Sequence, residues 1–175
     1  MKATDVIIYT DMDGTALTDW SLGPVVPERN LARIRAFVSA GGLFSVASGR
    51  QAPGILQLFP GVAFHAPLVC GNGSVIYDPA EQQVLRKTCL PTDYKCACVS
   101  YFLTHPEVWI VAADETRIWQ IVSGDPARDD QLNDWPRPRM SIEDFLSGDY
   151  VKVVYILAEG GDMEALKHEV AALPG

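Results

Sequence analysis

The sequence has no long hydrophobic run and no excess of positive charge. Its longest apolar runs, residues 6–9 and 153–158, are far shorter than the roughly 20 residues that a membrane-spanning helix needs. The 14 Lys and Arg residues are outnumbered by 22 Asp and Glu residues, which gives a net charge of −8. Nucleic-acid phosphates are bound mainly by clustered Lys and Arg, so this balance argues against a nucleic-acid partner. Because Asp5 and Asp11 flank the first apolar run, we expect no signal peptide and a cytoplasmic protein without a membrane segment.

Cysteine and histidine are also scarce. Four cysteines stand at positions 70, 89, 96 and 98, and there are three histidines. The pair at 96 and 98 has no matching second pair, so the usual ligand spacing of a zinc site is absent. We therefore predict reduced, partly buried thiols and assign no chemistry to the histidines.

The first half of the chain alternates between strand and helix patterns. With 175 residues, 48% of them hydrophobic, the chain is long and apolar enough to fold around a core. Apolar runs predict strands at 6–9, 43–47 and 67–70, with helices from 27 to 40 and from 54 to 59 between them. This order predicts an α/β fold with a doubly wound, Rossmann-like parallel sheet, in which strand 6–9 is buried on both faces.

After residue 74 the alternation of strand and helix patterns ends. An antiparallel hairpin is predicted first, followed by a mixture of helices and strands. The boundary falls near residue 88, which divides the chain into a core at 1–88 and a second module at 89–175. The remaining predicted segments are the hairpin strands 75–77 and 84–88, the helix 94–103, the strands 108–112, 117–122 and 151–157, a loop at 124–139 with a solvated Arg128-Asp129-Asp130 stretch, a short helix capped by Ser141, and a helix at 163–173.

A polar segment containing glycine follows each of the first three strands, at residues 11–15, 48–50 and 71–74. In open α/β sheets, ligands bind beyond the carboxyl ends of the strands. Asp11 and Asp13 supply two carboxylates there, one suited to a nucleophile or metal ligand and the other to a proton donor and acceptor. Their hard oxygens suit Mg²⁺. Gly14 permits a sharp turn, and Thr15 offers a hydroxyl and an amide to an anion.

The second and third segments add groups that bind anions. Ser48 provides a hydroxyl donor, Gly49 permits close approach of the backbone, and Arg50 is a forked cation suited to phosphate or sugar oxygens. Asn72, between two glycines, both donates and accepts hydrogen bonds. Aspartate, serine and asparagine also form helix caps and turns, which is the structural alternative for these positions.

These segments resemble the motifs of a known family. The Asp-Met-Asp-Gly-Thr segment at 11–15 is similar to the first motif of the haloacid dehalogenase-like (HAD) superfamily. Val-Ala-Ser-Gly-Arg at 46–50 and Cys-Gly-Asn-Gly-Ser at 70–74 resemble the second motif and the Asn-Gly segment of its Cof-type branch, which includes sugar-phosphate phosphatases. The resemblance extends from residue 6 to the end, because the region after 88 is similar to the α/β cap of that branch.

The resemblance implies hydrolysis of phosphate monoesters of small metabolites, with sugar phosphates favoured, through a phospho-aspartyl intermediate. Asp11 would attack phosphorus, while Asp13 would protonate the leaving group and then activate water. Mg²⁺ would be held by the Asp11 carboxylate and the Asp13 backbone carbonyl. Ser48 would bind the transferring phosphoryl group, and Arg50 and Asn72 would lie close to phosphate or substrate. The cap would shield the site and select the substrate.

Two later motifs of that branch, a lysine and a Gly-Asp-x-x-Asn-Asp segment, have no clear counterpart. Lys152 is predicted to be a solvent-facing residue of a cap strand. The segment 161–166 begins like the acidic motif but has Leu166 in place of its last aspartate, so Asp162 is better interpreted as a helix N-cap. We therefore expect the first two thirds of a two-module phosphatase, ending inside the cap, with both modules incomplete and weak or no activity alone.

Two other functions compete with this interpretation. A non-catalytic protein that binds a phosphorylated metabolite would use the same strand ends without the lysine and the last acids. A receiver-like phosphoacceptor domain fits less well, because the acidic motif follows the first strand.

The segment 135–139, which combines Trp135 with Arg137 and Arg139, is interpreted as a cap loop rather than a nucleic-acid site. The oligomeric state stays open, although an incomplete sheet exposes an edge that invites pairing.

Overall fold

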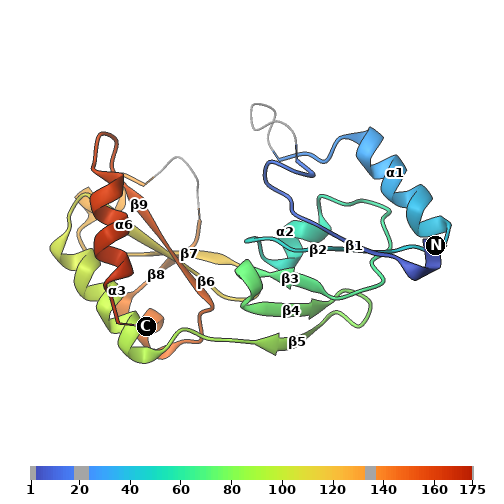
Figure 1. The fold of residues 1–175 in the computed structure, drawn as a ribbon. Coiled ribbons are helices and arrows are strands. Elements are labelled where there is room, and N and C mark those ends of the chain that lie inside the picture. The colour runs from blue at the N-terminus through green and yellow to red at the C-terminus, as the bar shows by residue number, and fades with distance from the viewer. Residues whose placement is uncertain (1–2, 18–23, 133–136, 175) are drawn as a thin grey trace. The chain divides into compact units, whose positions relative to one another are not determined.

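The structure is a computed structural model that describes residues 3–17, 24–132 and 137–174. The chain divides into two compact units, Met1–Thr88 and Cys89–Gly175 (Figure 1). Both units combine strands with helices, which confirms the predicted α/β class. None of the helices in the described part of the chain is long and apolar enough to cross a membrane.

The first unit begins with a parallel pair of strands. After a short 3-10 turn at Ala3–Asp5, strand β1 (Ile7–Thr10) pairs with β2 (Leu43–Val46), and helix α1 (Glu28–Ser39) connects them. A parallel bridge between Ala47 and Val69 then leads to β3 (Leu68–Cys70). Helix α2 (Ala52–Leu56) lies between β2 and β3. It begins two residues earlier than predicted because Pro53 occupies the first turn, where its missing N–H has no helical partner to lose.

An antiparallel hairpin completes this unit, as predicted. A single 3-10 turn, η2 (Gly71–Gly73), leads from β3 into β4 (Val75–Asp78), which pairs with β3 and with β5 (Gln83–Lys87). Figure 1 shows these three strands side by side. The change from parallel to antiparallel pairing therefore falls at the glycine-rich segment that follows β3.

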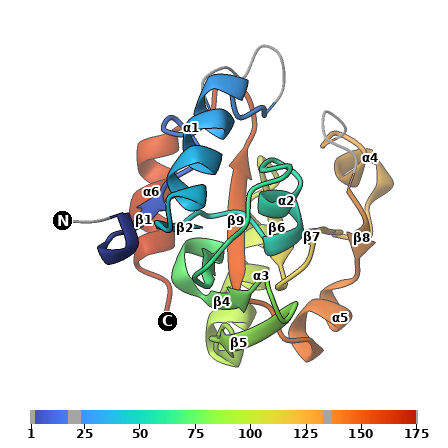
Figure 2. The same ribbon diagram turned by 90° about the vertical axis from the view of Figure 1, so that its right-hand side faces the viewer.

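The second unit is built on one four-stranded sheet with the order β8-β7-β6-β9 (Figure 2). Alternate β6 residues Val108, Ile110 and Ala112 contact side chains of three helices, so these helices pack on one face of the sheet. The strands are β6 (Val108–Ala113), β7 (Ile118–Ile121), β8 (Arg139–Met140) and β9 (Lys152–Leu157), the three packed helices are α3 (Thr92–Thr104), α5 (Ile142–Ser147) and α6 (Met163–Ala171), and a fourth helix is α4 (Pro126–Asp129).

The segment 124–139 differs from its prediction as a loop with a solvated stretch at 128–130. It contains α4, and Asp129 is only 3% exposed. The Asp129 carboxylate accepts hydrogen bonds from the N–H and hydroxyl of Ser123 at 2.8 and 2.9 Å and from Gly124 N at 3.0 Å. A buried carboxylate needs such donors, and here the preceding turn supplies them. Trp135 and Pro136, part of the predicted cap loop, lie outside the described residues.

Arg128 is also more enclosed than predicted. Its Nη2 donates to the backbone carbonyls of Phe102, His105 and Val108 at 2.6, 2.9 and 2.7 Å, and its guanidinium lies 4.1 Å from the centre of the Phe102 ring. Carbonyls at the end of α3 thereby gain a donor that the helix itself cannot provide. Of the predicted solvated stretch, only Asp130 is exposed, where it pairs with Arg139.

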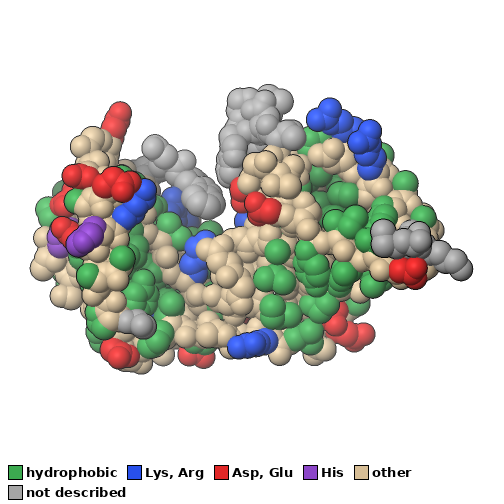
Figure 3. All heavy atoms as spheres, in the orientation of Figure 1, with side chains coloured by type: hydrophobic (Ala, Val, Ile, Leu, Met, Phe, Trp, Pro, Cys, Tyr) green, Lys and Arg blue, Asp and Glu red, His purple; other side chains and the backbone are tan. Residues whose placement is uncertain are grey.

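Strand β1 is more exposed than its apolar sequence predicts. Ile7, Ile8 and Tyr9 are 41–48% exposed. Within the described residues β2 is the one strand that pairs with β1, so the burial expected of a central parallel strand is incomplete. A groove of about 380 Å³ lies beside β1, lined in part by Ile8 and Phe37. Figure 3 shows hydrophobic side chains among the surface atoms of this unit.

We predict that replacing Asp129 by Asn destabilises the chain by about 2 to 3 kcal/mol, because an amide group turns a donor toward backbone N–H groups that need an acceptor. Urea unfolding followed by circular dichroism measures this change. Asp130→Asn is the matched control, since its partner Arg139 is on the surface and the change there should be at most about 1 kcal/mol. Equal effects of the two substitutions would contradict the assigned role of Asp129.

We also predict that the exposed edge of β1 promotes self-association. Replacing Ile8 by Lys should weaken association about tenfold, because edge-to-edge pairing would bring a lysine from each copy into the contact. Sedimentation velocity at several concentrations measures the effect. Met163→Lys adds the same charge at a residue of α6 that is 47% exposed and should leave association unchanged. An equal response of both variants would show that the edge is not the contact.

Candidate active site

Hydrogen bonds between strands bring the three predicted polar segments to one edge of the first unit. β1 and β2 run parallel, and Ala47 N donates to Thr10 O at 2.9 Å just where the two strands end. Ser48 N donates to Val69 O at 2.8 Å, which continues the parallel arrangement to β3. The carboxyl ends of β1, β2 and β3 therefore lie next to one another, as expected for a ligand site in an α/β sheet.

The first segment forms a tight turn with its two carboxylates outside. Met12 is fully buried, and its carbonyl accepts hydrogen bonds from Thr15 N and Leu17 N at 3.2 and 2.9 Å. Met12 N donates to Asp11 Oδ1 at 2.7 Å, which orients the Asp11 carboxylate. Gly14 has a φ of +82°, a conformation that side-chain-bearing residues avoid. With Met12 as an anchor, the side chains of Asp11 and Asp13 stay exposed at the strand end.

The second segment lies against the first through an ion pair. The Arg50 guanidinium contacts both oxygens of the Asp13 carboxylate, with Nη2 at 2.8 Å from Oδ1 and Nε at 3.2 Å from Oδ2. Ser48 is 7% exposed, and its Oγ accepts a hydrogen bond from Arg50 N at 3.3 Å. Sequence reasoning placed Arg50 near substrate and missed its contact with Asp13. Residues 37 positions apart meet here because of strand pairing, for which sequence spacing carries no signal.

The third segment is bonded to the second through its backbone. Gly71 N donates to Arg50 O and Asn72 N donates to Ser48 O, both at 3.1 Å. Gly71, Asn72 and Gly73 have φ values of +56°, +58° and +96°. Such a run of positive φ requires glycine, or asparagine, which tolerates this region better than most residues. The turn leaves the Asn72 side chain exposed at the site.

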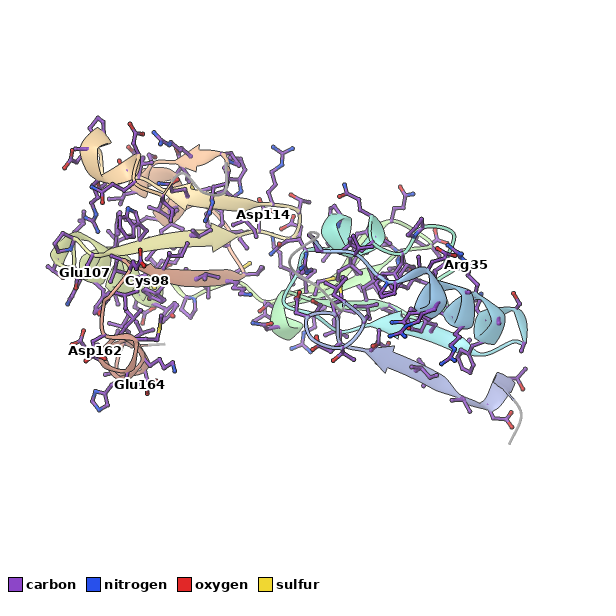
Figure 4. The ribbon with its side chains drawn as sticks, turned by 90° about the horizontal axis from the view of Figure 1, so that it is seen from above. Arg35, Cys98, Glu107, Asp114, Asp162 and Glu164 are labelled. Carbon is purple, nitrogen blue, oxygen red and sulfur yellow. The ribbon has the colours of Figure 1, made fainter. Side chains whose placement is uncertain are left out.

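The two weak counterparts of the later motifs belong to the second unit. Asp162 accepts hydrogen bonds from Glu164 N and Ala165 N, both at 3.0 Å, which confirms its prediction as the N-cap of α6. Figure 4 shows Asp162 and Glu164 at the start of that helix. Lys152 is half-buried at the first position of β9, opposite Ala113 of β6. Asp162 thus caps a helix of the second unit, and Lys152 belongs to the sheet of the same unit.

The oxygen donors at the end of β1 fit part of a magnesium site. Among residues 3–17, 24–132 and 137–174, no group of three or more His, Cys, Asp or Glu side chains could hold a metal. Mg²⁺ is held in proteins by one or two carboxylates together with substrate phosphates and water, rather than by a cage of protein groups. The Asp11 carboxylate and the Asp13 carbonyl match this hard-oxygen chemistry and would supply two of the ligands of a bound Mg²⁺.

The cysteine next to the site is buried and neutral. Cys70 ends β3, is 1% exposed and precedes the Asn72 turn. Burial raises the pKa of its thiol to about 11, so it is protonated at neutral pH and is no nucleophile. The four cysteines are free: Cys98 is also buried, Cys89 is half-buried and Cys96 is exposed, which confirms the prediction of unpaired, partly buried thiols.

Comparison with known proteins identifies sequence relatives of this chain. The family model of haloacid dehalogenase-like hydrolases matches residues 8–174. A curated relative, the 5-amino-6-(5-phospho-D-ribitylamino)uracil phosphatase YbjI of Escherichia coli (strain K12), is 31% identical over 121 residues, which are 69% of this chain and 43% of the relative.

Solved structures of low sequence identity share the fold. The HAD subclass IIB sugar phosphatase BT4131 has a TM-score of 0.71 at 15% identity, covering 96% of this chain and 63% of that protein. BT1666 from Bacteroides thetaiotaomicron has a TM-score of 0.71 at 16% identity, covering 97% of this chain and 61% of that protein. TM0651 from Thermotoga maritima has a TM-score of 0.65 at 19% identity, with coverages of 94% and 59%.

The fold is thus an α/β fold with a Rossmann-like core, and its polar strand ends form the candidate site. The match to the family model over residues 8–174 shows that the chain belongs to the haloacid dehalogenase-like hydrolase family. It spans less than half the length of the curated relative and about three fifths of the length of the solved structures.

We predict that Cys70 reacts slowly with alkylating agents. At pH 8, a pKa of about 11 leaves about 100-fold less thiolate than the unshifted value of 9.0, and burial slows the reaction further. Mass spectrometry after brief treatment with iodoacetamide should find Cys96 modified first and Cys70 unmodified. In urea all four cysteines should react at similar rates. Equal rates for Cys70 and Cys96 in the folded chain would contradict the burial of Cys70.

Proposed function

We propose that this chain carries the phosphoryl-transfer motifs of a phosphatase that hydrolyses phosphate monoesters of small metabolites. The observation that carries this proposal is the convergence of three polar segments, at residues 11–15, 48–50 and 71–74, on one sheet edge. Two carboxylates, a forked cation, a hydroxyl and an amide together make up a set of groups suited to phosphate-ester chemistry. Membership in a hydrolase family supports the same reaction class.

Asp11 is the proposed nucleophile. Its Oδ1 is engaged by Met12 N, so Oδ2 is the oxygen that we assign to the attack on phosphorus. The bond from Oδ2 to phosphorus forms while the bond from phosphorus to the ester oxygen breaks. The product of this step is an aspartyl phosphate, and the departing alkoxide needs a proton.

Asp13 is the proposed acid and base. It gives a proton to the departing ester oxygen in the first step and takes a proton from the attacking water in the second. That water oxygen bonds to phosphorus as the bond to Asp11 Oδ2 breaks, which releases inorganic phosphate, restores the Asp11 carboxylate and leaves Asp13 with the proton that it gives in the next cycle. Since Asp11 and Asp13 flank the buried Met12, both side chains lie at the same strand end.

The remaining groups hold the phosphoryl oxygens. The Ser48 hydroxyl and the Asn72 amide donate hydrogen bonds, and the turn at Gly14 and Thr15 offers the Thr15 hydroxyl. The expected role of the Thr15 amide is corrected, because Thr15 N donates to Met12 O within the turn. Mg²⁺, held by the Asp11 carboxylate and the Asp13 carbonyl, would offset the repulsion between a carboxylate and a phosphate. Arg50 contributes positive charge at the same edge.

Sugar phosphates and related phosphorylated metabolites are the proposed substrates. The names of YbjI, which acts on a phosphorylated ribitylamino compound, and of BT4131, a sugar phosphatase, support this choice. The second unit, residues 89–175, is proposed as a cap that selects among such substrates. The cap assignment follows the sequence resemblance. The structural match to BT4131 covers 96% of this chain, so it extends into the second unit.

A non-catalytic role in binding a phosphorylated metabolite is the second candidate. It is favoured by the small number of metal donors, since the described residues contain no cluster of three or more acidic, histidine or cysteine side chains. For the same reason we expect turnover by these 175 residues alone to be slow. Calorimetry measures the binding of a phosphate ester and separates the two functions. A binding protein takes up the ester and releases no inorganic phosphate, whereas a phosphatase releases it.

We predict that Asp11→Asn abolishes the hydrolysis of p-nitrophenyl phosphate in the presence of Mg²⁺, with a loss of roughly 10³-fold or more, because an amide oxygen is a poor nucleophile. Release of p-nitrophenol over hours measures the slow rate. Asp93→Asn, an equivalent change at an exposed position of α3, is the control and should leave the rate unchanged. A variant at Asp11 that keeps the original rate would contradict the phospho-aspartyl mechanism.

A further inference from the structure

The contact between Arg50 and Asp13 occupies both oxygens of the proposed acid and base. Nη2 donates to Oδ1 and Nε donates to Oδ2, at 2.8 and 3.2 Å. A guanidinium has only donors, so it can neither relay a proton to Asp13 nor take one from it in this geometry. While the pair is closed, both Asp13 oxygens face the guanidinium and one acceptor site of each is engaged, which leaves the carboxylate less able to act on a departing ester oxygen or an attacking water.

The backbone on either side of this pair is held in place, so only side chains can open it. Arg50 N donates to Ser48 Oγ, and Arg50 O accepts a hydrogen bond from Gly71 N. Asp13 belongs to the turn anchored by Met12. The Arg50 side chain, in contrast, ends in a guanidinium on a flexible stem, and the side chains of Arg50 and Asp13 are 24% and 41% exposed. A dissolved anion can therefore reach the pair.

A phosphate group is a strong competitor for the guanidinium. It offers two oxygens in the same forked geometry as a carboxylate and carries more negative charge. Asp13 would also be repelled by an incoming phosphate as long as it stayed in place. Both effects favour a change of partner, in which the guanidinium leaves Asp13 and binds the phosphate oxygens.

We infer that Arg50 is a positioning residue that holds Asp13 in the absence of substrate and exchanges it for the oxygens of the bound phosphate. This inference rests on the proposed function. The exchange releases Asp13 only when an anionic substrate is present, so that binding of the phosphate and release of the acid and base are one event. The freed carboxylate then takes a proton from water, which it gives to the departing ester oxygen. The same exchange moves a positive charge from the carboxylate to the phosphate.

The test follows the side-chain Nε–H signal of Arg50 by proton–nitrogen NMR in the full 175-residue chain. Arg50→Lys identifies the signal, and inorganic phosphate is the probe. Without phosphate, Asp13→Asn should shift the signal away from its position in the unsubstituted chain, because the ion pair is lost. With saturating phosphate, the two proteins should give the same signal, because phosphate has replaced residue 13 as the partner of Arg50.

Arg35 is the matched control. It is paired with an exposed glutamate, Glu28, at 2.7 Å and lies on α1, where Figure 4 labels it. Its Nε–H signal should not respond to phosphate. Arg50→Lys should weaken phosphate binding about tenfold in calorimetry, because a lysine cannot make the forked contact. An unchanged affinity would show that phosphate does not recruit the guanidinium and would overturn the inference.

Two further outcomes separate this inference from the proposed function. If calorimetry shows phosphate bound while the Arg50 signal keeps its phosphate-free position, the exchange is refuted and the phosphate site stands. If millimolar phosphate does not bind at all, both the proposed function and the exchange are refuted. Thermal melts of both variants establish that the substitutions leave the chain folded.

Discussion

Parallel hydrogen bonding from β1 through β2 to β3 is the constraint on which the site depends. The bond from Ala47 N to Thr10 O and the bond from Ser48 N to Val69 O align the ends of three strands that are distant in sequence. Each end then turns through residues that permit sharp changes of direction, such as Gly14 and the run around Asn72. A shift of one residue in either pairing would move the polar side chains of one segment away from the other two.

Electrostatics provides the second constraint. The chain has a net charge of −8, so the phosphate binding that we propose needs positive charge concentrated at one place. At the described strand ends, Arg50 provides it, and its contact with Asp13 shows that the carboxylate uses this charge in the absence of a ligand. The proposed Mg²⁺ would add to the same balance. In the function that we propose, substrate binding, metal binding and the release of Asp13 depend on this one small set of charges.

Most of the fold followed from local patterns. Runs of apolar residues between glycine-bearing turns predicted the strands of both units except β8, which pairs with β7 where a loop was expected. The predicted N-cap at Asp162 is confirmed by its two hydrogen bonds to α6. Predictions failed where burial depends on distant neighbours. The stretch around Asp129 was predicted to be solvated because it is polar, yet the turn at Ser123 supplies donors that make its burial possible. β1 was predicted to be buried because it is apolar, yet it is exposed.

By itself, the sequence determined the order of strands and helices apart from α4 and β8, the three polar segments and the turns that carry them, since each depends on residues close together in the chain. Only the tertiary structure decided that Arg50 meets Asp13, that Asp129 is enclosed and that Cys70 lies buried beside the site. These features depend on strand register and on packing between segments far apart in sequence. No local pattern encodes them, because the residues adjacent in sequence are equally compatible with these side chains being exposed to solvent. Their burial and contacts depend on neighbours that only the folded chain brings close.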